Sequence, residues 1–166
     1  MNGELVVLRA LHVLPGVLWV GAALAMTWVI EPKLRAAGPT VQGPAMRAIG
    51  KTFSLVLSVA AGITILMGFA LISRTPGHGF GDLFTTSWGW AIGVGMVTGL
   101  IAAGIGSMAG SVLRKMDALG AQISGAPTPE QAAAMAVLQG QMRRNGRVSS
   151  VFAVIAVVAM AAARYV

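Results

Sequence analysis

Residues 5–30 read LVVLRALHVLPGVLWVGAALAMTWVI, and Arg9 and His12 are the only ionisable residues in this stretch. A helix needs about 20 mostly apolar residues to cross the hydrocarbon core of a bilayer. This stretch is long enough for one crossing. Three further apolar stretches follow it, at about residues 52–73, 88–111 and 148–166. The sequence therefore predicts an all-α membrane protein, a bundle of four transmembrane helices.

The composition agrees with lipid as the solvent of the fold. Of the 166 residues, 56% are hydrophobic and 10% are charged, whereas about a quarter are charged in ordinary globular domains. The length suits one domain, residues 1–166. The absence of cysteine excludes a disulfide scaffold, a thiolate zinc site and a cysteine nucleophile. No catalytic residue is predicted, and whether the protein is an enzyme stays open.

The cations predict how the helices are oriented, because cytoplasmic loops carry an excess of Lys and Arg. Nine of the 12 cations lie in the first and third loops: Lys33, Arg35, Arg47, Lys51, Arg114, Lys115, Arg143, Arg144 and Arg147. We expect a multi-pass protein of the bacterial cytoplasmic (inner) membrane, with both termini periplasmic or extracellular. The net charge of +7 then marks a basic rim beside anionic lipid headgroups, and nucleic acid is not an expected partner.

The segment 112–147 is long for a loop of a four-span protein. Ser124 to Pro127 form a break, after which Thr128 is expected as a helix N-cap with Pro129 in the first turn. This pattern predicts that the third and fourth helices extend into the cytoplasm as a helical hairpin. The hairpin is either a solubilising extension or a docking surface for a partner.

His12 is the only histidine within a predicted span. Arg9, Gly16 and Trp19 lie three residues before it and four and seven after it, close to one helix face. A histidine above a glycine notch and an indole resembles the seat of a haem in a helix bundle. The alternative is a neutral histidine bonded to a neighbouring helix. The indole N–H of Trp19, near mid-membrane, needs a partner of its own, either a backbone carbonyl or a bound ligand.

Methionines from the other spans fall in the same layer as His12. At a rise of ~1.5 Å per residue, Met67 and Met160 lie ~9 Å below the outer surface, His12 ~10 Å and Met96 ~12 Å. Thioether and imidazole groups bind Cu(I), and a His/Met pair can hold haem iron. These methionines are equally expected to fill gaps in an apolar core.

Three residues at the outer side complete the candidate site. His78, in the loop of residues 74–87, is a second possible axial ligand or a solvated loop residue. Arg9 and Arg164 could pair with an acidic group, such as a haem propionate or a lipid phosphate. Plain anchoring at the interface is the alternative for each arginine.

Residues 8–21 read LRALHVLPGVLWVG. This segment resembles the L-H-x3-G-x2-W-x-G opening of a superfamily that includes the CopD copper-resistance domain, the HemJ-type protoporphyrinogen oxidase and uncharacterised four-span proteins. Residues 160–165, MAAARY, look like the close of the uncharacterised group. The resemblance implies a role with b-type haem or copper, with His12 at the position of the family histidine.

Two functions remain as hypotheses. The first is a small membrane protein that binds haem b or copper, for electron transfer or cofactor handling. The second is an accessory subunit without chemistry of its own, which packs against a larger respiratory or photosynthetic complex or forms a homo-oligomer. A proton-coupled transporter is disfavoured because it needs a buried carboxylate. Asp82 falls in the outer loop, and Glu31 is expected at the inner membrane edge.

Overall fold

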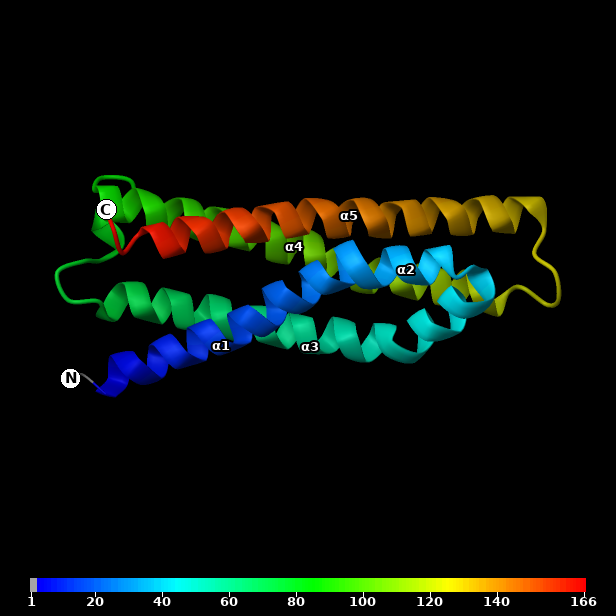
Figure 1. The fold of residues 1–166 in the computed structure, drawn as a ribbon, viewed down its shortest axis with the longest axis horizontal. Coiled ribbons are helices and arrows are strands. Elements are labelled where there is room, and N and C mark those ends of the chain that lie inside the picture. The colour runs from blue at the N-terminus through cyan, green and yellow to red at the C-terminus, as the bar shows by residue number, and fades with distance from the viewer. Residues whose placement is uncertain (1–2) are drawn as a thin grey trace.

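The computed structural model describes residues 3–166, which form a long helical bundle (Figure 1). In chain order the elements are α1 (Gly3–Ala25), a π-helical turn η1 (Met26–Ile30), α2 (Glu31–Ala36), α3 (Pro39–Arg74), a short 3-10 turn η2 (Phe80–Asp82), α4 (Ser87–Ala121) and α5 (Pro129–Ala162). No strand occurs among these described residues. The predicted all-α fold is confirmed.

Four helical stretches are long and apolar enough to cross a membrane: Gly3–Ala36, Pro39–Arg74, Ser87–Ala121 and Pro129–Ala162. The first of them joins α1, η1 and α2 into one rod. The first three stretches extend beyond the apolar segments that predicted them, and the fourth begins earlier than predicted but ends at Ala162 instead of residue 166, so the breaks between helices are short. These are the properties of a multi-pass membrane protein.

The second membrane-spanning helix, α3, begins earlier than its apolar residues suggest. Gly38 has a φ of +90°, a left-handed conformation that glycine adopts without steric cost, and it ends the turn after α2. Pro39 then takes the first position of α3, where its missing N–H is not needed. Pro44 lies inside α3 without ending it. Residues 39–51 are therefore the first turns of the spanning helix itself.

The last helix starts at the predicted cap. The backbone N–H of Gln131 donates to the hydroxyl of Thr128 over 3.3 Å, and the N–H of Thr128 donates to Oε1 of Gln131 over 3.0 Å. This reciprocal capping box satisfies two N–H groups that a helix start leaves unpaired. From there α5 continues through Gly146 to Ala162. The predicted helical hairpin is thus formed by the far ends of α4 and α5.

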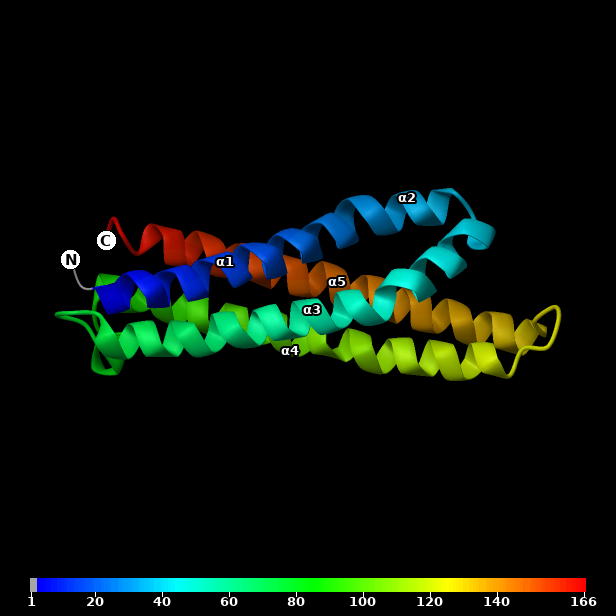
Figure 2. The same ribbon diagram turned by 90° about the horizontal axis from the view of Figure 1, so that it is seen from below.

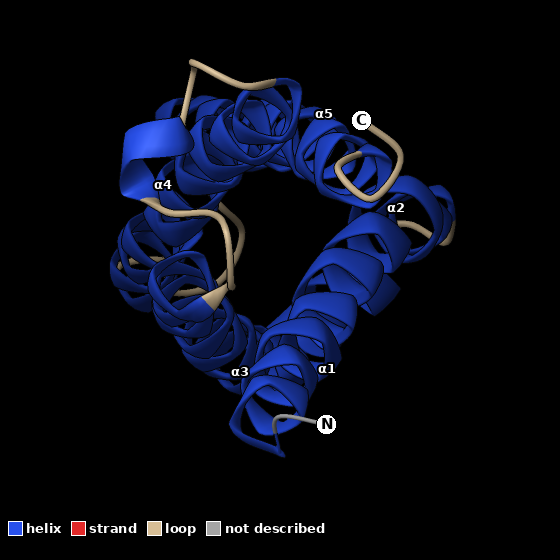
Figure 3. Ribbon diagram, turned by 90° about the vertical axis from the view of Figure 1, so that its left-hand side faces the viewer, coloured by secondary structure: helices blue, strands red, loops and turns tan. Residues whose placement is uncertain are grey.

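Viewed along the bundle axis, α1, α3, α4 and α5 follow one another around a ring (Figure 3). The closest pairs are α4 with α5 and α1 with α3. The start of α1 and the end of α5 lie at the same end of the bundle (Figures 1 and 2). At that end the guanidinium of Arg74, which closes α3, pairs with the carboxylate of Glu4 at the start of α1.

Small residues set the close approach of the helices. A Cβ added to Gly95 would lie 2.6 Å from Cγ of Met160, and one added to Gly106 would lie 3.3 Å from Oγ of Ser149. Ser149 also donates its hydroxyl to the carbonyl of Ala102 over 2.8 Å. Gly95 and Gly106 of α4 therefore serve packing within the bundle, against α5, as small residues commonly do in membrane helices.

Candidate functional site

His12 lies in the contact between α1 and α3. Its Nδ1 donates to the carbonyl oxygen of Thr64 over 2.7 Å. A Cβ added to Gly68 would lie 3.0 Å from Cε1 and 3.1 Å from Nδ1 of the same ring, so the imidazole occupies the space that this glycine leaves. In the neutral imidazole with its proton on Nδ1, the lone pair is on Nε2.

The space left by Gly16, expected beside His12, is occupied by the side chain of Thr64 from α3. A Cβ added to Gly16 would lie 3.3 Å from the methyl group of Thr64. Thr64 is buried, and its hydroxyl donates to the carbonyl of Ala60 over 2.8 Å. Gly16 thus allows α1 and α3 to approach each other at Thr64.

The other residues predicted for the outer layer lie in separate places. Met160 packs against Gly95 in the contact between α4 and α5. The ring of His78 stacks on Trp88, with 4.2 Å between the ring centroids. Met67 and Met96 are half-buried, whereas Arg9 and Arg164 are exposed. Within residues 3–166 no group of three or more His, Cys, Asp or Glu side chains could hold a metal ion.

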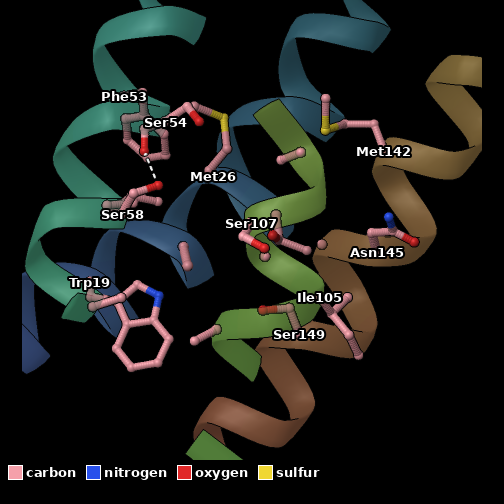
Figure 4. A pocket seen from close by; sticks show the side chains of 18 of the residues that line it. Trp19, Met26, Phe53, Ser54, Ser58, Ile105, Ser107, Met142, Asn145 and Ser149 are labelled. Carbon is pink, nitrogen blue, oxygen red and sulfur yellow. Dashed lines mark hydrogen bonds between the residues drawn. The ribbon is translucent and has the colours of Figure 1, made fainter. Parts of the chain in front are cut away.

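Trp19 belongs to the core of the bundle. It is 9% exposed and packs with four small residues from the other three long helices: Ala60, Ala61, Ala102 and Ala153. The polar edge of its indole ring points into a cavity between the helices (Figure 4). Trp19 therefore closes one end of that cavity near the middle of the bundle.

The cavity has a volume of about 380 Å³ and is bounded by all four long helices. It extends from Trp19 to Glu31, which are separated by roughly 18 Å of helix at about 1.5 Å per residue. Most of its wall is apolar, and Met26, Phe53 and Met142 are among the side chains in view (Figure 4). Its polar lining residues are Thr27, Glu31, Ser54, Ser58, Ser107, Arg143, Asn145, Arg147 and Ser149.

Two polar atoms in this lining have no hydrogen-bond partner among the described residues. They are Oε1 of Glu31 and Nδ2 of Asn145, both fully buried. The Glu31 side chain is 15% exposed, and Nε of Arg35 lies 3.7 Å from Oε1. That distance makes an ion pair but is too long for a hydrogen bond. Glu31, expected at the membrane edge, thus contributes a largely buried carboxylate to the wall of the cavity.

The π-helical turn η1 leads directly to Glu31. A proline clashes with the carbonyl four residues before it, and Pro32 stands four residues after Trp28. A wider turn accommodates that proline, and such π-turns occur often at functional sites. A Cβ added to Gly146 of α5 would lie 3.2 Å from the hydroxyl of Thr27, so η1 packs closely on α5.

A second hollow is an open apolar groove on the outer surface of α1 and α3. It is lined by Leu14, Pro15, Leu18, Leu55, Val56, Val59, Ala60 and Ile63. Several of these side chains are large, apolar and exposed. Such a surface suits the acyl chains of a bilayer.

The cavity was not predicted from the sequence. Two features of the sequence could have indicated it. One is the acid followed by proline at the end of the first span, and the other is the presence of Ser54 and Ser58 one turn apart on α3, where the Ser58 hydroxyl donates to the Ser54 carbonyl. His12 is absent from the lining of both the cavity and the groove, whereas the predicted Trp19 lines the cavity. No protein-family model, no curated protein and no solved structure matches this chain.

Proposed function

We propose that this protein binds an apolar small molecule within the bilayer and handles it as a cofactor or metabolite. The observation that carries this proposal is the cavity, which is mostly apolar and contains a few buried polar groups. Small-molecule sites commonly measure about 300–1,000 Å³ and combine apolar walls with a small number of polar groups that orient the ligand. The cavity matches this description in size and in lining.

The lining of the cavity suits a molecule with an apolar body and a polar end. Its apolar side chains gain dispersion contacts with an apolar body. Its hydroxyl groups and cations can pair with a polar end, which otherwise would be costly to bury.

A matched pair of glycine substitutions tests the proposal. Gly62 lines the cavity, and a Cβ added there meets nothing within 4 Å, so Gly62→Leu is expected to fill part of the cavity. Gly104 on α4 is equally open but is exposed and outside the lining, so Gly104→Leu is the control. Organic extracts of the purified proteins are compared by mass spectrometry with extracts of empty nanodiscs.

The expected result is an apolar compound that is enriched with the wild type and with Gly104→Leu but depleted with Gly62→Leu. Equal amounts in all three proteins contradict the proposal. The absence of any enriched compound from the wild type contradicts it as well. Circular dichroism checks that both variants keep their helical content.

A second candidate function is the binding of haem b or copper at His12. The observation in its favour is the bond from Nδ1 to Thr64, because a metal-ligating histidine usually donates its other ring N–H to a carbonyl or carboxylate. Bound haem iron or copper would supply one-electron chemistry. Nε2 of His12 would be the ligand atom, and Arg9 and Arg164 would be the cations available to haem propionates. Neither the cavity nor the groove reaches His12, so a porphyrin held there would lie outside both.

An absorption spectrum of protein purified from a haem-replete host, with metal analysis, tests this candidate. Asparagine places an N–H close to the position of Nδ1 but has no counterpart of Nε2. A Soret band or bound copper that both His12→Asn and His12→Ala remove supports ligation by Nε2. A colourless, metal-free wild-type protein argues against it.

The orientation and the partners remain proposals. We infer that both termini face the periplasm or the exterior of a bacterial inner membrane, because the cation-rich loops lie at the opposite end of the bundle from the termini. The cavity then lies in the cytoplasmic half of the bilayer. The accessory-subunit hypothesis would be supported if the protein co-purified with a large respiratory or photosynthetic complex, and weakened if it were stable in isolation.

A further inference from the structure

The indole N–H of Trp19 points into the cavity without a partner. Trp19 is 9% exposed, and its neighbours in the core are alanines of α3, α4 and α5. The hydrogen bonds of residues 3–166 include one from the indole of Trp28 but none from that of Trp19. An indole N–H usually finds a partner when it is buried. Since no backbone carbonyl serves here, the partner of this N–H is left to a molecule in the cavity.

The same N–H is open to the cavity. In Figure 4 the nitrogen edge of the ring is turned toward the space between the helices. Nε1 of Trp19 is not among the fully enclosed, unpartnered polar atoms of the described residues, which are Oε1 of Glu31 and Nδ2 of Asn145. A ligand can therefore reach Nε1 directly. An indole N–H only donates, so the group that meets it must be an acceptor.

The arginines of the cavity lie at its other end. Arg143 and Arg147 flank Gly146 on α5. At Gly146 this helix packs on Thr27 of η1. Thr27 follows Trp19 by eight residues, which is about 12 Å of helix at about 1.5 Å per residue. The acceptor that meets Trp19 is therefore expected to be uncharged, because an ion without a counter-charge is costly to bury.

A carbonyl oxygen is the uncharged acceptor that needs the fewest partners in this wall. It accepts through its lone pairs and brings no proton. A hydroxyl group also accepts, but its own proton then needs a second, correctly placed partner. A protonated amine cannot accept at all.

We propose that the ligand of this cavity carries an uncharged carbonyl group, such as that of a ketone, whose oxygen accepts from Nε1 of Trp19. The rest of the molecule is apolar and extends along the apolar wall toward η1. This inference rests on the proposed function, since it names the class of molecule that the same cavity binds.

Three probes with one ring system test the inference on the unaltered protein: 2-acetylnaphthalene, 2-isopropenylnaphthalene and 1-(2-naphthyl)ethanol. The second replaces the carbonyl oxygen of the first by a CH₂ group of similar size, and the third replaces the carbonyl by a hydroxyl group. Binding to the protein in lipid nanodiscs is measured by titration calorimetry, and partition into empty nanodiscs is subtracted. We expect the ketone to bind about twofold to tenfold more tightly than the alkene, as the net contribution of one neutral hydrogen bond predicts, and more tightly than the alcohol.

The outcomes separate this inference from the proposed function. If the alkene binds and the ketone binds no more tightly, the carbonyl inference is wrong while the cavity proposal stands. The same holds if the alcohol binds as tightly as the ketone or more tightly. If no probe binds above the empty nanodiscs, the cavity proposal fails and the inference fails with it.

A substitution assigns the preference to Trp19. Trp19→Phe keeps an aromatic ring but removes the N–H, so the advantage of the ketone over the alkene is expected to disappear. The alkene corrects for any change in the size of the cavity. Trp90→Phe is the control, because Trp90 is 55% exposed and lies outside the lining. Circular dichroism checks that both variants keep their helical content.

Isotope-edited infrared spectroscopy of the bound ketone gives a second readout. A hydrogen bond lowers the stretching frequency of a carbonyl group, so the band of the ketone is expected at a lower frequency in the wild type and in Trp90→Phe than in Trp19→Phe. An equal frequency in all three proteins overturns the assignment to Trp19.

Discussion

The indole N–H of Trp28 donates to the hydroxyl of Ser150 over 3.0 Å, and this bond joins the π-helical turn η1 to α5. Ser150 is 1% exposed, whereas the ring of Trp28 is 54% exposed. The bond holds the wide turn just before Glu31 against the helix that carries Asn145. Together with the close approach of Gly146 to Thr27, this bond fixes η1 against α5 next to the cavity.

A double-mutant cycle measures that contact. Trp28→Phe and Ser150→Ala each remove one partner, and the coupling between them is expected to be about 0.6 kcal/mol, the average for hydrogen bonds between membrane helices. The free energy of unfolding in detergent is measured for the wild type, both single variants and the double variant. Strictly additive effects would show that the two side chains do not stabilise each other.

The contact between Gly95 and Met160 predicts a packing defect. Gly95→Ala places a Cβ 2.6 Å from Cγ of Met160 and 3.3 Å from the carbonyl oxygen of Ala156. Overpacking of this kind costs about 1–3 kcal/mol of stability. Gly104→Ala, where the added methyl group meets nothing within 4 Å, is expected to be neutral or slightly stabilising. Equal effects of the two substitutions on thermal unfolding would contradict the close approach of α4 and α5 at Gly95.

The bond from His12 to Thr64 predicts different effects for two substitutions of the histidine. His12→Asn retains an N–H near the position of Nδ1, so the bond to the Thr64 carbonyl is expected to survive in part. His12→Ala removes it and is expected to cost about 1 kcal/mol or less. Thermal unfolding in nanodiscs measures both. If the two variants are equally unstable, the Nδ1 bond makes no measurable contribution.

The proposed orientation is tested by labelling single cysteines, which the cysteine-free chain allows without prior removal of native thiols. Pro76 and Ala126 are both exposed and lie in the loops at opposite ends of the bundle. A membrane-impermeant maleimide applied to intact cells with a permeabilised outer membrane is expected to label Pro76→Cys and to spare Ala126→Cys. The reverse pattern would place the termini in the cytoplasm.

The number and class of the elements could be predicted because they depend on properties that are local in sequence. Runs of apolar residues predicted the four helices, and Ser124 to Pro127 followed by Thr128 predicted the start of α5. The start of α3 was misjudged because residues 39–51 are polar enough to lower the hydropathy while remaining helical. Helical spacing also placed Gly16 and Trp19 near one face of α1; in the structure Gly16 lies against Thr64 and Trp19 lies in the core.

Which residues meet at the candidate site could not be predicted in the same way, because this depends on which helices are neighbours. Spacing along α1 gives the helix face that carries His12. Only the order of the helices around the bundle shows that Thr64 of α3 lies opposite Nδ1 of His12. Glu31 and Asn145 are far apart in sequence, and they line one cavity because α5 returns beside η1. The burial of the Glu31 carboxylate beside the cavity was not predicted, because it depends on the contact of η1 with α5 and not on the hydropathy of the span.

The helix pairs α2–α3 and α4–α5 do not reach equally far at the end of the bundle that carries the cation-rich loops, and this offset has a steric consequence. At about 1.5 Å per residue, the 35 residues of α4 span about 52 Å, against about 30 Å for the hydrocarbon core. In Figures 1 and 2 the link between α4 and α5 lies farther out than the turn between α2 and α3. A large soluble molecule that approaches this side meets residues 122–128 first. The same link is therefore the place where an inserted reporter domain or a bound nanobody would disturb the rest of the protein least.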